Sequence, residues 1–444
     1  MKEKNNPAYY ITSLSVEGVR CFSDKQILNL TDSEGRLKQW TVILGNNGVG
    51  KTTLLQCISA LEPFKFKDDD TTYTPTSHRI SITNKSNFND SSTIKLNMEI
   101  YYDIKFGDKI NSQKLLNPNV SIGTPSNSVI LSNFTYWGFE CPKNFLIYGY
   151  GATRLMGKKS PEEENWSDNS ASLFSDDATL ISADKWLKEK DYAESKAKKD
   201  EKGYFTKQFS TVKDILINIL PDVTDIRIKE PTKEDSSLPV EFLTHYGWVR
   251  IEELGLGYRS MIAWMVDLTA RLFKRYPDSD NPIAEPAIVL IDEIDLHLHP
   301  KWQREIMGYL SERFTKTQFI VTAHSPLIVQ SATDANIVVL KRDGDHVIID
   351  NNVKTIHGWR IDQIMASDLF GEISQRPVAL EKPLKERREI LSNVNLTEED
   401  KKRLKELEEE IGDLPTGESI QDIEAMNIIH DVAKFIKERE QKAK

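Results

Sequence analysis

A short run of glycine, lysine and threonine near the N-terminus has the spacing of a phosphate-binding loop. Residues 45–52 read Gly-Asn-Asn-Gly-Val-Gly-Lys-Thr and fit the pattern G-x-x-x-x-G-K-[ST]. In such a loop glycines let consecutive N–H groups point at a phosphate, the lysine neutralises phosphate oxygens, and the threonine hydroxyl holds Mg²⁺. The alternative is a glycine-rich turn that precedes a lysine by chance. We expect Mg²⁺ on Thr52 and a nucleoside triphosphate among Asn46, Asn47, Gly48, Val49, Gly50, Lys51, Thr52 and Thr53.

An acidic pair, Asp292-Glu293, follows directly after the apolar run 287–291. Such a run is typical of a strand buried on both faces, as in parallel sheets. A carboxylate at the carboxyl end of this strand is placed for a metal ion. We therefore expect Asp292 to hold Mg²⁺ through a bound water and Glu293 to polarise the attacking water. The alternative is an acidic helix start that interacts with the helix macrodipole.

A histidine occupies the corresponding place after another apolar run. Residues 318–322 lead into Ala323-His324-Ser325-Pro326. At a strand end His324 can hydrogen-bond a γ-phosphate and so report its presence; alternatively, it is a structural histidine whose ring is satisfied within the fold. Because it follows two segments suited to a nucleotide, we favour a catalytic role for His324 beside Glu293.

A glycine turn, residues 254–258 (Leu-Gly-Leu-Gly-Tyr), lies between the phosphate loop and the acidic pair and precedes an apolar helix expected at 260–275. Phosphate loop, glycine turn with helix, acidic strand and histidine follow one another in ATP-binding-cassette (ABC) ATPases. AAA+ machines and small GTPases have neither the histidine nor the glycine turn at these places. In ABC folds the N–H groups of the turn face the γ-phosphate of another protomer. The order therefore predicts that two chains sandwich two ATP molecules head to tail.

The hydrophobic pattern indicates which elements position these segments. Residues 9–30 alternate as a strand pair does around Gly18, the run 40–44 is typical of a buried strand, and 52–62 has a helical apolar stripe. Between the phosphate loop and the acidic pair we expect strands near 80–82, 94–100, 145–148, 224–229 and 247–252, and helices near 184–200 and 211–219. No stretch is long and regular enough for an extended coiled coil.

We expect an α/β fold: a P-loop ABC-type ATPase head with a mixed sheet and helices, a β-rich lobe, a short helical insertion and a C-terminal helical region. The expected boundaries are 1–62 and 245–375 for the core, 63–156 for the lobe, 157–244 for the insertion with its return strands, and 376–444 for a helical docking region. In the docking region, apolar stripes recur at Leu404, Leu407 and Ile411 and at Ile428, Val432, Phe435 and Ile436.

The composition bounds the class of protein. Lys plus Arg number 58 and Asp plus Glu 68, and the net charge of −10 disfavours a surface covered with nucleic acid, although it allows a local basic groove. No run of about 18 apolar residues exists, and the N-terminal sequence lacks the apolar core of a secretory signal. Three cysteines without CxxC spacing cannot form a disulfide framework. We expect a soluble, cytoplasmic protein without a membrane partner.

His297 and His299 form a His-x-His pair, which raises the alternative of a zinc site. A tetrahedral zinc site needs four ligands, and no third and fourth ligands lie at plausible spacing. We therefore do not expect zinc there.

Seven segments carry a resemblance to a known family. GNNGVGKTT (45–53), ELGLGYRSMIAWMVDL (253–268), VLIDEIDLHLHPKWQ (289–303) and FIVTAHSP (319–326) resemble the RecF/OLD/SMC-like branch of ABC ATPases, and LSVEGVRCFSD (14–24) is similar to its first hairpin. FLIYGYGATR (145–154) and SLFSDDATLISADKWL (172–187) resemble bacterial AAA-type ATPases found in antiphage defence systems such as Septu.

The resemblance implies roles for individual residues. Lys51 and Thr52 match the phosphate lysine and the Mg²⁺ ligand, Asp292 and Glu293 match the acidic pair with Glu293 as the water-activating base, and His324 matches the switch histidine. Gly257, with Tyr258 beside it, matches the signature glycine at the partner's nucleotide, and His299 stands where ABC proteins carry the D-loop aspartate.

Two departures from the ABC pattern affect the expected chemistry. Gly255 replaces the signature serine, and the loss of that hydroxyl contact leads us to expect slow turnover, because such a bond contributes about 1.5–3 kcal/mol. No glutamine lies in 145–157, where a Q-loop would sit, which leaves Tyr150 and Arg154 as candidates to replace it.

The sequence also suggests what the ATP site serves. Neither the clustered carboxylates of a TOPRIM domain nor an HNH-like set of histidines is present. We therefore expect a homodimer or higher homo-oligomer that hydrolyses ATP with Mg²⁺ and gates or scaffolds a separate nuclease, of HNH type, in an antiphage defence complex. The alternative is a RecF-like DNA-repair ATPase that clamps DNA itself; a transporter motor subunit fits least. The lysines at 196–202 fit a solvated helix face better than a DNA contact.

Overall fold

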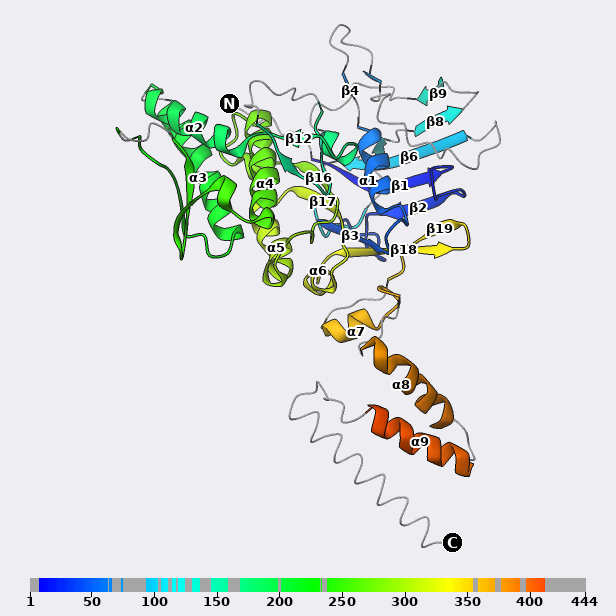
Figure 1. Cartoon of the computed structure of the whole chain (residues 1–444). Coiled ribbons are helices and arrows are strands. Elements are labelled where there is room, and N and C mark those ends of the chain that lie inside the picture. The colour runs from blue at the N-terminus through cyan, green and yellow to red at the C-terminus, as the bar shows by residue number, and fades with distance from the viewer. Residues whose placement is uncertain are drawn as a thin grey trace. The chain divides into compact units, whose positions relative to one another are not determined.

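The computed structural model describes residues 8–62, 64–65, 73–74, 93–102, 105–110, 114–116, 119–123, 130–135, 145–158, 168–198, 201–231, 233, 238–353, 358–371, 377–391 and 397–411. The chain divides into two compact units, Met1–Glu372 and Ile373–Lys444. Figure 1 labels elements of both units. Within the described ranges, no helix combines the length and the apolar character that a membrane span requires.

A six-stranded sheet forms the centre of the first unit. Its strands lie in the order β10-β16-β17-β3-β18-β19. All neighbours are parallel except β18 and β19, which are antiparallel. The strands are β10 (Ile147–Tyr150), β16 (Ala287–Ile291), β17 (Thr317–Thr322), β3 (Trp40–Gly45), β18 (Asn336–Asp343) and β19 (His346–Asp350). The mixed α/β fold with a mainly parallel sheet is thus confirmed, and the expected buried strands at 40–44, 287–291 and 318–322 are present.

The two faces of this sheet are covered by different elements, and neighbouring residues of one strand serve opposite faces. Val42, Val289 and Val321 pack into a cluster with apolar residues of helices α3, α4 and α5. Ile43, Leu290 and Ile320 pack into a second cluster with helix α1 and strands β1 and β2. This two-sided burial explains why the strands are continuous apolar runs instead of alternating ones. The helices are α1 (Lys51–Ala60), α3 (Lys202–Ile219), α4 (Leu256–Arg275), α5 (Pro300–Arg313), α6 (Pro326–Ser331) and α7 (Ile361–Met365).

A second sheet, entirely antiparallel, lies beside the first and contains the expected N-terminal hairpin. Its path is β2-β1-β6-β8-β9, and β7 pairs with β6. The strands are β1 (Tyr9–Glu17), β2 (Gln26–Asn29), β6 (Thr93–Tyr102), β7 (Lys114–Leu116), β8 (Asn119–Gly123) and β9 (Ile130–Thr135); a separate pair is formed by β4 (Phe64–Lys65) and β5 (Tyr73–Thr74). The expected strand at 80–82 lies outside the described residues.

The expected domain boundaries cut across both sheets. β1 and β2 fall within the expected core, yet they pair with the strands of the expected lobe. β10 falls within the expected lobe, yet it is an edge strand of the central sheet. The physical reason is burial: all four residues of β10 are buried, which only a position beside β16 and beneath covering helices provides.

The segment between the sheets and α4 folds as helices and short strands. Its elements are β11 (Leu155–Met156), β12 (Thr179–Leu180), α2 (Ala183–Lys196), α3, β13 (Asp225–Ile228), β14 (Val240–Thr244) and β15 (Gly247–Arg250), with single 3₁₀ turns at Ala171–Leu173, Ile251–Glu253 and, after α4, Pro282–Ala284. Ser182 caps α2 by accepting a hydrogen bond from the amide of Lys185. The helix expected at 211–219 begins nine residues earlier, and β14 is a strand that the hydrophobic pattern does not predict.

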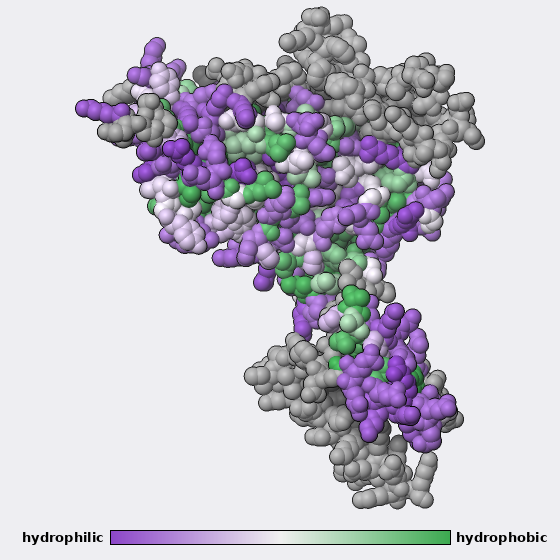
Figure 2. Space-filling view, in the orientation of Figure 1, coloured by the Kyte–Doolittle hydropathy of each residue, from purple (hydrophilic) through white to green (hydrophobic). Residues whose placement is uncertain are grey.

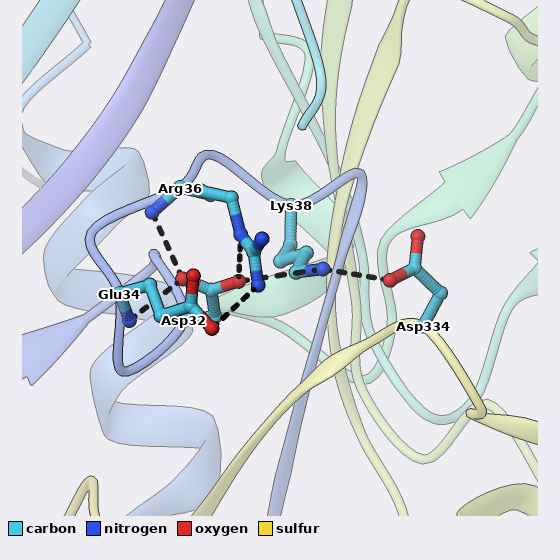
Figure 3. A network of polar contacts seen from close by, with 5 residues as sticks. All are labelled: Asp32, Glu34, Arg36, Lys38 and Asp334. Carbon is cyan, nitrogen blue, oxygen red and sulfur yellow. Dashed lines mark hydrogen bonds and ion pairs between the residues drawn. The ribbon is translucent and has the colours of Figure 1, made fainter. Parts of the chain in front are cut away.

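A charged network fixes the turn between β2 and β3 (Figure 3). The Asp32 carboxylate accepts hydrogen bonds from the amides of Glu34 and Arg36 and from the Arg36 guanidinium, each at 2.9 Å. Lys38 lies between Asp32, at 3.4 Å, and Asp334, at 2.6 Å. Burial alone would raise the pKa of Asp32, but the hydrogen bonds from Arg36 and Glu34 outweigh it and lower the pKa. The network therefore favours the charged carboxylate and orients the chain as it enters β3.

The C-terminal unit contains the helices α8 (Val378–Leu391) and α9 (Glu398–Ile411). Arg403 of α9 donates to both carboxylate oxygens of Glu386 of α8, at 2.7 and 2.9 Å. Leu407 is fully buried, in agreement with the first expected apolar stripe, whereas the stripe at 428–436 lies outside the described residues. Figure 2 shows that polar residues dominate the visible surface of this unit, while polar and apolar residues are interspersed on the first.

Candidate functional site

The phosphate loop connects the carboxyl end of β3 to the start of α1, as its sequence predicts. Gly45, Gly48 and Gly50 all have positive φ angles, of 146°, 78° and 88°. A Cβ at Gly50 would lie 2.5 Å from the sulfur of Cys21 and 2.8 Å from the ring of Phe22, so the N-terminal hairpin packs directly on the loop. A Cβ at Gly48 would meet nothing within 4 Å. Glycine is therefore required at Gly50 by both backbone and packing, and the loop is open at Gly48.

Lys51 is held at the base of this loop. Lys51 is 7% exposed, and its Nζ donates hydrogen bonds to the carbonyls of Gly45 at 2.8 Å and Asn46 at 2.9 Å. Burial lowers the pKa of Lys51, and the carboxylates of Asp292, Glu293 and Asp295 act in the opposite direction. A buried cation that is hydrogen-bonded to two carbonyl oxygens is suited to exchange them for phosphate oxygens.

Thr52 and Asp292, the two expected metal ligands, are in direct contact although 240 residues separate them. The Thr52 hydroxyl donates to Oδ2 of Asp292 at 2.7 Å, and Asp292 is 5% exposed. Mg²⁺ binds through a few protein oxygens and completes its octahedron with water and phosphate oxygens. The hydroxyl and the carboxylate fit that requirement.

Thr322, the last residue of β17, completes this arrangement and is a site residue that the sequence pattern does not single out. Its hydroxyl donates to Oδ1 of Asp292 at 2.6 Å and accepts from the amide of Glu293 at 2.7 Å. The same threonine therefore orients the carboxylate of one acidic residue and the backbone of the next. The available signal in the sequence is its place directly before Ala323-His324, at the end of an expected buried strand.

The residues after β16, 292–298, form a turn that we call the acidic turn. Glu293 and His297 have positive φ angles of 49° and 63°, and α5 begins only at Pro300. The alternative of an acidic helix start is therefore wrong, because residues 292–297 form turns and the next helix begins only at Pro300. Glu293 is half-buried, at the end of the strand next to the one that carries Thr322.

His324 lies at the carboxyl end of β17, between the ends of β16 and β3. Its amide donates to Oδ2 of Asp295 at 3.0 Å, and the amide of Ala323 donates to the carbonyl of Ile43 at 3.2 Å. His324 is half-buried. Because β16, β17 and β3 are parallel neighbours, the phosphate loop, the acidic turn and His324 all lie at the carboxyl end of the sheet. Figure 1 shows these three strands side by side.

The glycine turn starts α4 and packs against the acidic turn of its own chain. Gly255 is the N-cap of α4, with φ −58° and ψ 157°, and a Cβ there would be 3.9 Å from the nearest atom, in the Tyr258 ring. A Cβ at Gly257 would lie 2.3 Å from the carbonyl oxygen of His297. Gly257 is therefore a close-packing glycine within one chain, whatever else it contacts.

The other residues expected at a partner's nucleotide range from half-buried Tyr258 to exposed positions. Tyr258 donates its hydroxyl to the carbonyl of Pro221 at 3.1 Å and packs edge-on against Trp302, so it serves the fold of its own chain. Leu256 is 50% exposed, and Gly255 and His299 are exposed. His299 caps α5 by accepting a hydrogen bond from the amide of Lys301 at 3.3 Å. In the described part of the chain, no group of three or more His, Cys, Asp and Glu side chains is placed to hold a metal ion.

Tyr150 and Arg154, the two candidates to replace the missing Q-loop glutamine, contact different parts of the chain. Tyr150 donates its hydroxyl to Oδ2 of the buried Asp267 of α4 at 2.9 Å, and Asp267 also accepts from Arg271 at 2.7 Å. Burial raises the pKa of Tyr150 well above its usual value. Arg154 instead donates to the backbone carbonyls of Asp292 and Glu293. Tyr150 thus links the central sheet to α4, and Arg154 links the segment after β10 to the acidic turn.

Several known proteins are similar to the chain over most of its length. A family profile described as "AAA domain, putative AbiEii toxin, Type IV TA system" matches residues 40–330. The "Septu protein PtuA" of Bacillus mycoides strain KBAB4 is 28% identical over 417 residues, covering 91% of this chain and 51% of that protein. The "Retron Vc95 probable ATPase" of Vibrio cholerae serotype O1 biovar El Tor is 25% identical over 403 residues, covering 76% of this chain and 74% of that protein. The chain thus spans about half the length of the PtuA relative.

Among solved structures, the SMC head bound to the C-winged helix domain of ScpA is 16% identical and covers 77% of this chain and 96% of that one, with a TM-score of 0.43. The family profile covers more than half of this chain, and its range includes the phosphate loop, the glycine turn, the acidic turn and His324. The chain therefore belongs to this AAA domain family.

Proposed function

We propose that the chain binds and slowly hydrolyses ATP with Mg²⁺. In this proposal Lys51 contacts the β- and γ-phosphates, Thr52 and Asp292 hold Mg²⁺, Glu293 polarises the attacking water and His324 contacts the γ-phosphate. A series of hydrogen bonds, each 2.6–2.7 Å long, supports the proposal: it links the side chains of Thr52, Asp292 and Thr322 and ends at the amide of Glu293. Such preorganisation places the groups that must act together before substrate arrives. Mg²⁺, when bound, would neutralise the charge that develops on the phosphate oxygens.

The proposed enzyme works as a homodimer or a larger homo-oligomer. Gly255, Gly257 and Tyr258 of one chain, with His299, would close over the ATP held by another chain. The exposure of Gly255, Leu256 and His299 supports this, since these residues are accessible to another molecule. The absence of a serine hydroxyl at Gly255 supports slow turnover.

We further propose that this chain, through ATP binding and hydrolysis, gates or scaffolds a separate nuclease, of HNH type, within a cytoplasmic antiphage defence complex. Two relatives named as a Septu protein and as a retron ATPase support this placement.

The proposed base is tested by Glu293→Gln, with Glu305→Gln as a matched control on the exposed face of α5. Glu293→Gln keeps the shape of the side chain but cannot accept a proton, so ATP binding should persist and turnover should fall at least about 100-fold. ATP should then hold the chain as a dimer, measured by analytical ultracentrifugation beside phosphate release. Unchanged turnover in Glu293→Gln would show that the base is assigned wrongly.

The alternative is an ATPase that itself clamps DNA. Helix α2, which could supply a basic surface, carries four lysines and four acidic residues, so its charges balance. Salt-sensitive, ATP-dependent binding of duplex DNA by the isolated chain would favour the alternative over the nuclease switch.

A further inference from the structure

Arg154 is a buried cation whose hydrogen-bond acceptors are main-chain oxygens. It is 2% exposed, and Nε donates to the carbonyl of Gly151 at 3.0 Å. One terminal nitrogen donates to the carbonyls of both Asp292 and Glu293, each at 2.5 Å. Burial lowers the pKa of Arg154 to about 10, while the nearby carboxylates of Asp292, Asp295 and Glu293 oppose the shift. The guanidinium thus remains charged at neutral pH, deep beside the acidic turn.

The two carbonyls can reach one nitrogen only because the chain turns at Glu293. In a regular strand, successive carbonyls point to opposite sides, so a single donor cannot contact both. The positive φ of Glu293, 49°, brings them to the same side. This conformation is disfavoured for a residue with a Cβ, by about 1–2 kcal/mol, and must be held by its surroundings.

The backbone of Glu293 is held from both ends. Its amide donates to the Thr322 hydroxyl at 2.7 Å, and its carbonyl accepts from Arg154. With the amide and the carbonyl both fixed, the direction of the Cα–Cβ bond is fixed as well. The direction in which the Glu293 side chain leaves the backbone therefore depends on Arg154.

The segment that carries Arg154 is itself tightly placed. The amide of Asp292 donates to the carbonyl of Tyr150 at 2.8 Å, which extends the pairing of β10 with β16. A Cβ at Gly151 would lie 2.0 Å from the carbonyl oxygen of Ser172, and its amide donates to the Ser172 hydroxyl. Arg154 also has a positive φ, 40°. The guanidinium therefore extends from a constrained base.

We propose that Arg154 is a positioning residue for ATP hydrolysis, which holds the acidic turn in the left-handed conformation that aims Glu293 at the attacking water. The inference rests on the proposed role of Glu293 as the base. Arg154 has no contact with the phosphates in this assignment and acts through the backbone of the acidic turn.

The test compares Arg154→Lys with Arg271→Lys. Arg271 is a second buried arginine, 8% exposed, and it donates to Asp267 of its own helix and to Asn169. Lysine keeps the charge and loses the planar fork of donors. We expect Arg154→Lys to lower kcat about 10-fold or more, with the Kd for a fluorescent ATP analogue changed less than about threefold. Amide hydrogen exchange should accelerate in the peptide 292–298, and Arg271→Lys should do neither.

The readouts distinguish a positioning role from a general structural one. Equal kcat in Arg154→Lys and the unsubstituted chain would overturn the proposal, as would a loss of kcat matched by loss of nucleotide affinity or reproduced by Arg271→Lys. If the unsubstituted chain hydrolyses no ATP, the proposed function is wrong, and amide exchange in Arg154→Lys then tests the contact with the acidic turn by itself. Unaltered exchange at 292–298 would refute the inference that Arg154 holds this turn. Accelerated exchange confined to 292–298 would support that inference.

Discussion

The two halves of the candidate site differ in how far each is completed within one chain. In the phosphate loop and acidic turn, Lys51, Thr52 and Asp292 are hydrogen-bonded to their own chain, and Lys51 and Asp292 are buried. In the glycine turn, Gly255 and Leu256 are exposed at the start of α4. The first half is preorganised by the fold of a single chain, and the second presents a helix start that another molecule can reach. This contrast predicts that nucleotide binding by one chain and closure by a second molecule can be disrupted independently of each other.

The largest effect expected is on the preorganised half. Lys51→Ala removes a buried cation from the loop, so ATP should bind about 100-fold more weakly, because charge-assisted hydrogen bonds to phosphate are lost. Lys301→Ala, which removes an exposed lysine near the second half, should leave binding to the isolated chain unchanged. Isothermal titration calorimetry of both variants measures this contrast, and equal losses would remove the distinction between the halves.

A smaller effect is expected at Thr322, which organises the acidic residues. Thr322→Val removes the hydroxyl that donates to Asp292 and accepts from Glu293, and leaves buried polar atoms without partners. Unfolding free energy should fall by about 2 kcal/mol, and ATP turnover should fall with it. The matched control is Thr41→Val, since the buried Thr41 hydroxyl has no hydrogen-bond partner among the described residues. Chemical denaturation should find Thr41→Val neutral or stabilising; a similar loss in both variants would contradict the assigned role of Thr322.

The smallest effect on stability is expected in the second half, at Gly255. Its backbone angles and open surroundings accept a side chain, and serine is a better helix N-cap than glycine by a few tenths of a kcal/mol. Gly255→Ser should therefore raise the melting temperature slightly. It should also raise ATP turnover at high protein concentration, where a dimer can form, and not at low concentration.

Gly257 is the wrong position for this experiment, because any Cβ there meets the carbonyl of His297 in the same chain. Gly257→Ala should therefore disturb the acidic turn even in a monomer.

For Gly255→Ser, an effect on ATP turnover that does not depend on protein concentration would argue against closure by a partner.

Those parts of the site whose chemistry is local can be predicted from the sequence. The phosphate loop and the acidic pair each lie next to a strand with the pattern of a buried one, so the amino-acid sequence alone is enough to single out Lys51, Thr52 and Asp292. It is not enough for Thr322 and for the backbone contacts of Arg154. Their roles depend on the lateral order β10-β16-β17-β3, which hydrophobic patterns do not specify, and Thr322 is inconspicuous inside an apolar strand.

Errors in the expected fold have a similar origin. The first half of α3 mixes aromatic and polar residues, and the regular apolar stripe starts only at Val212, which hides the start of the helix at Lys202. β14 is short, and it is recognisable chiefly through its pairing with β13 and β15. Pairing partners, unlike hydrophobic periods, are properties of the assembled chain.

The neighbours of β3 have a consequence for protein synthesis. The strand that delivers the phosphate loop pairs only with β17 and β18 among the described strands, and both are translated long after it. Until residues 317–343 have left the ribosome, β3 has no partner strand in the central sheet, and its apolar side chains stay unburied. Nascent fragments that stop short of β17 should therefore be unable to retain ATP and should depend on chaperones.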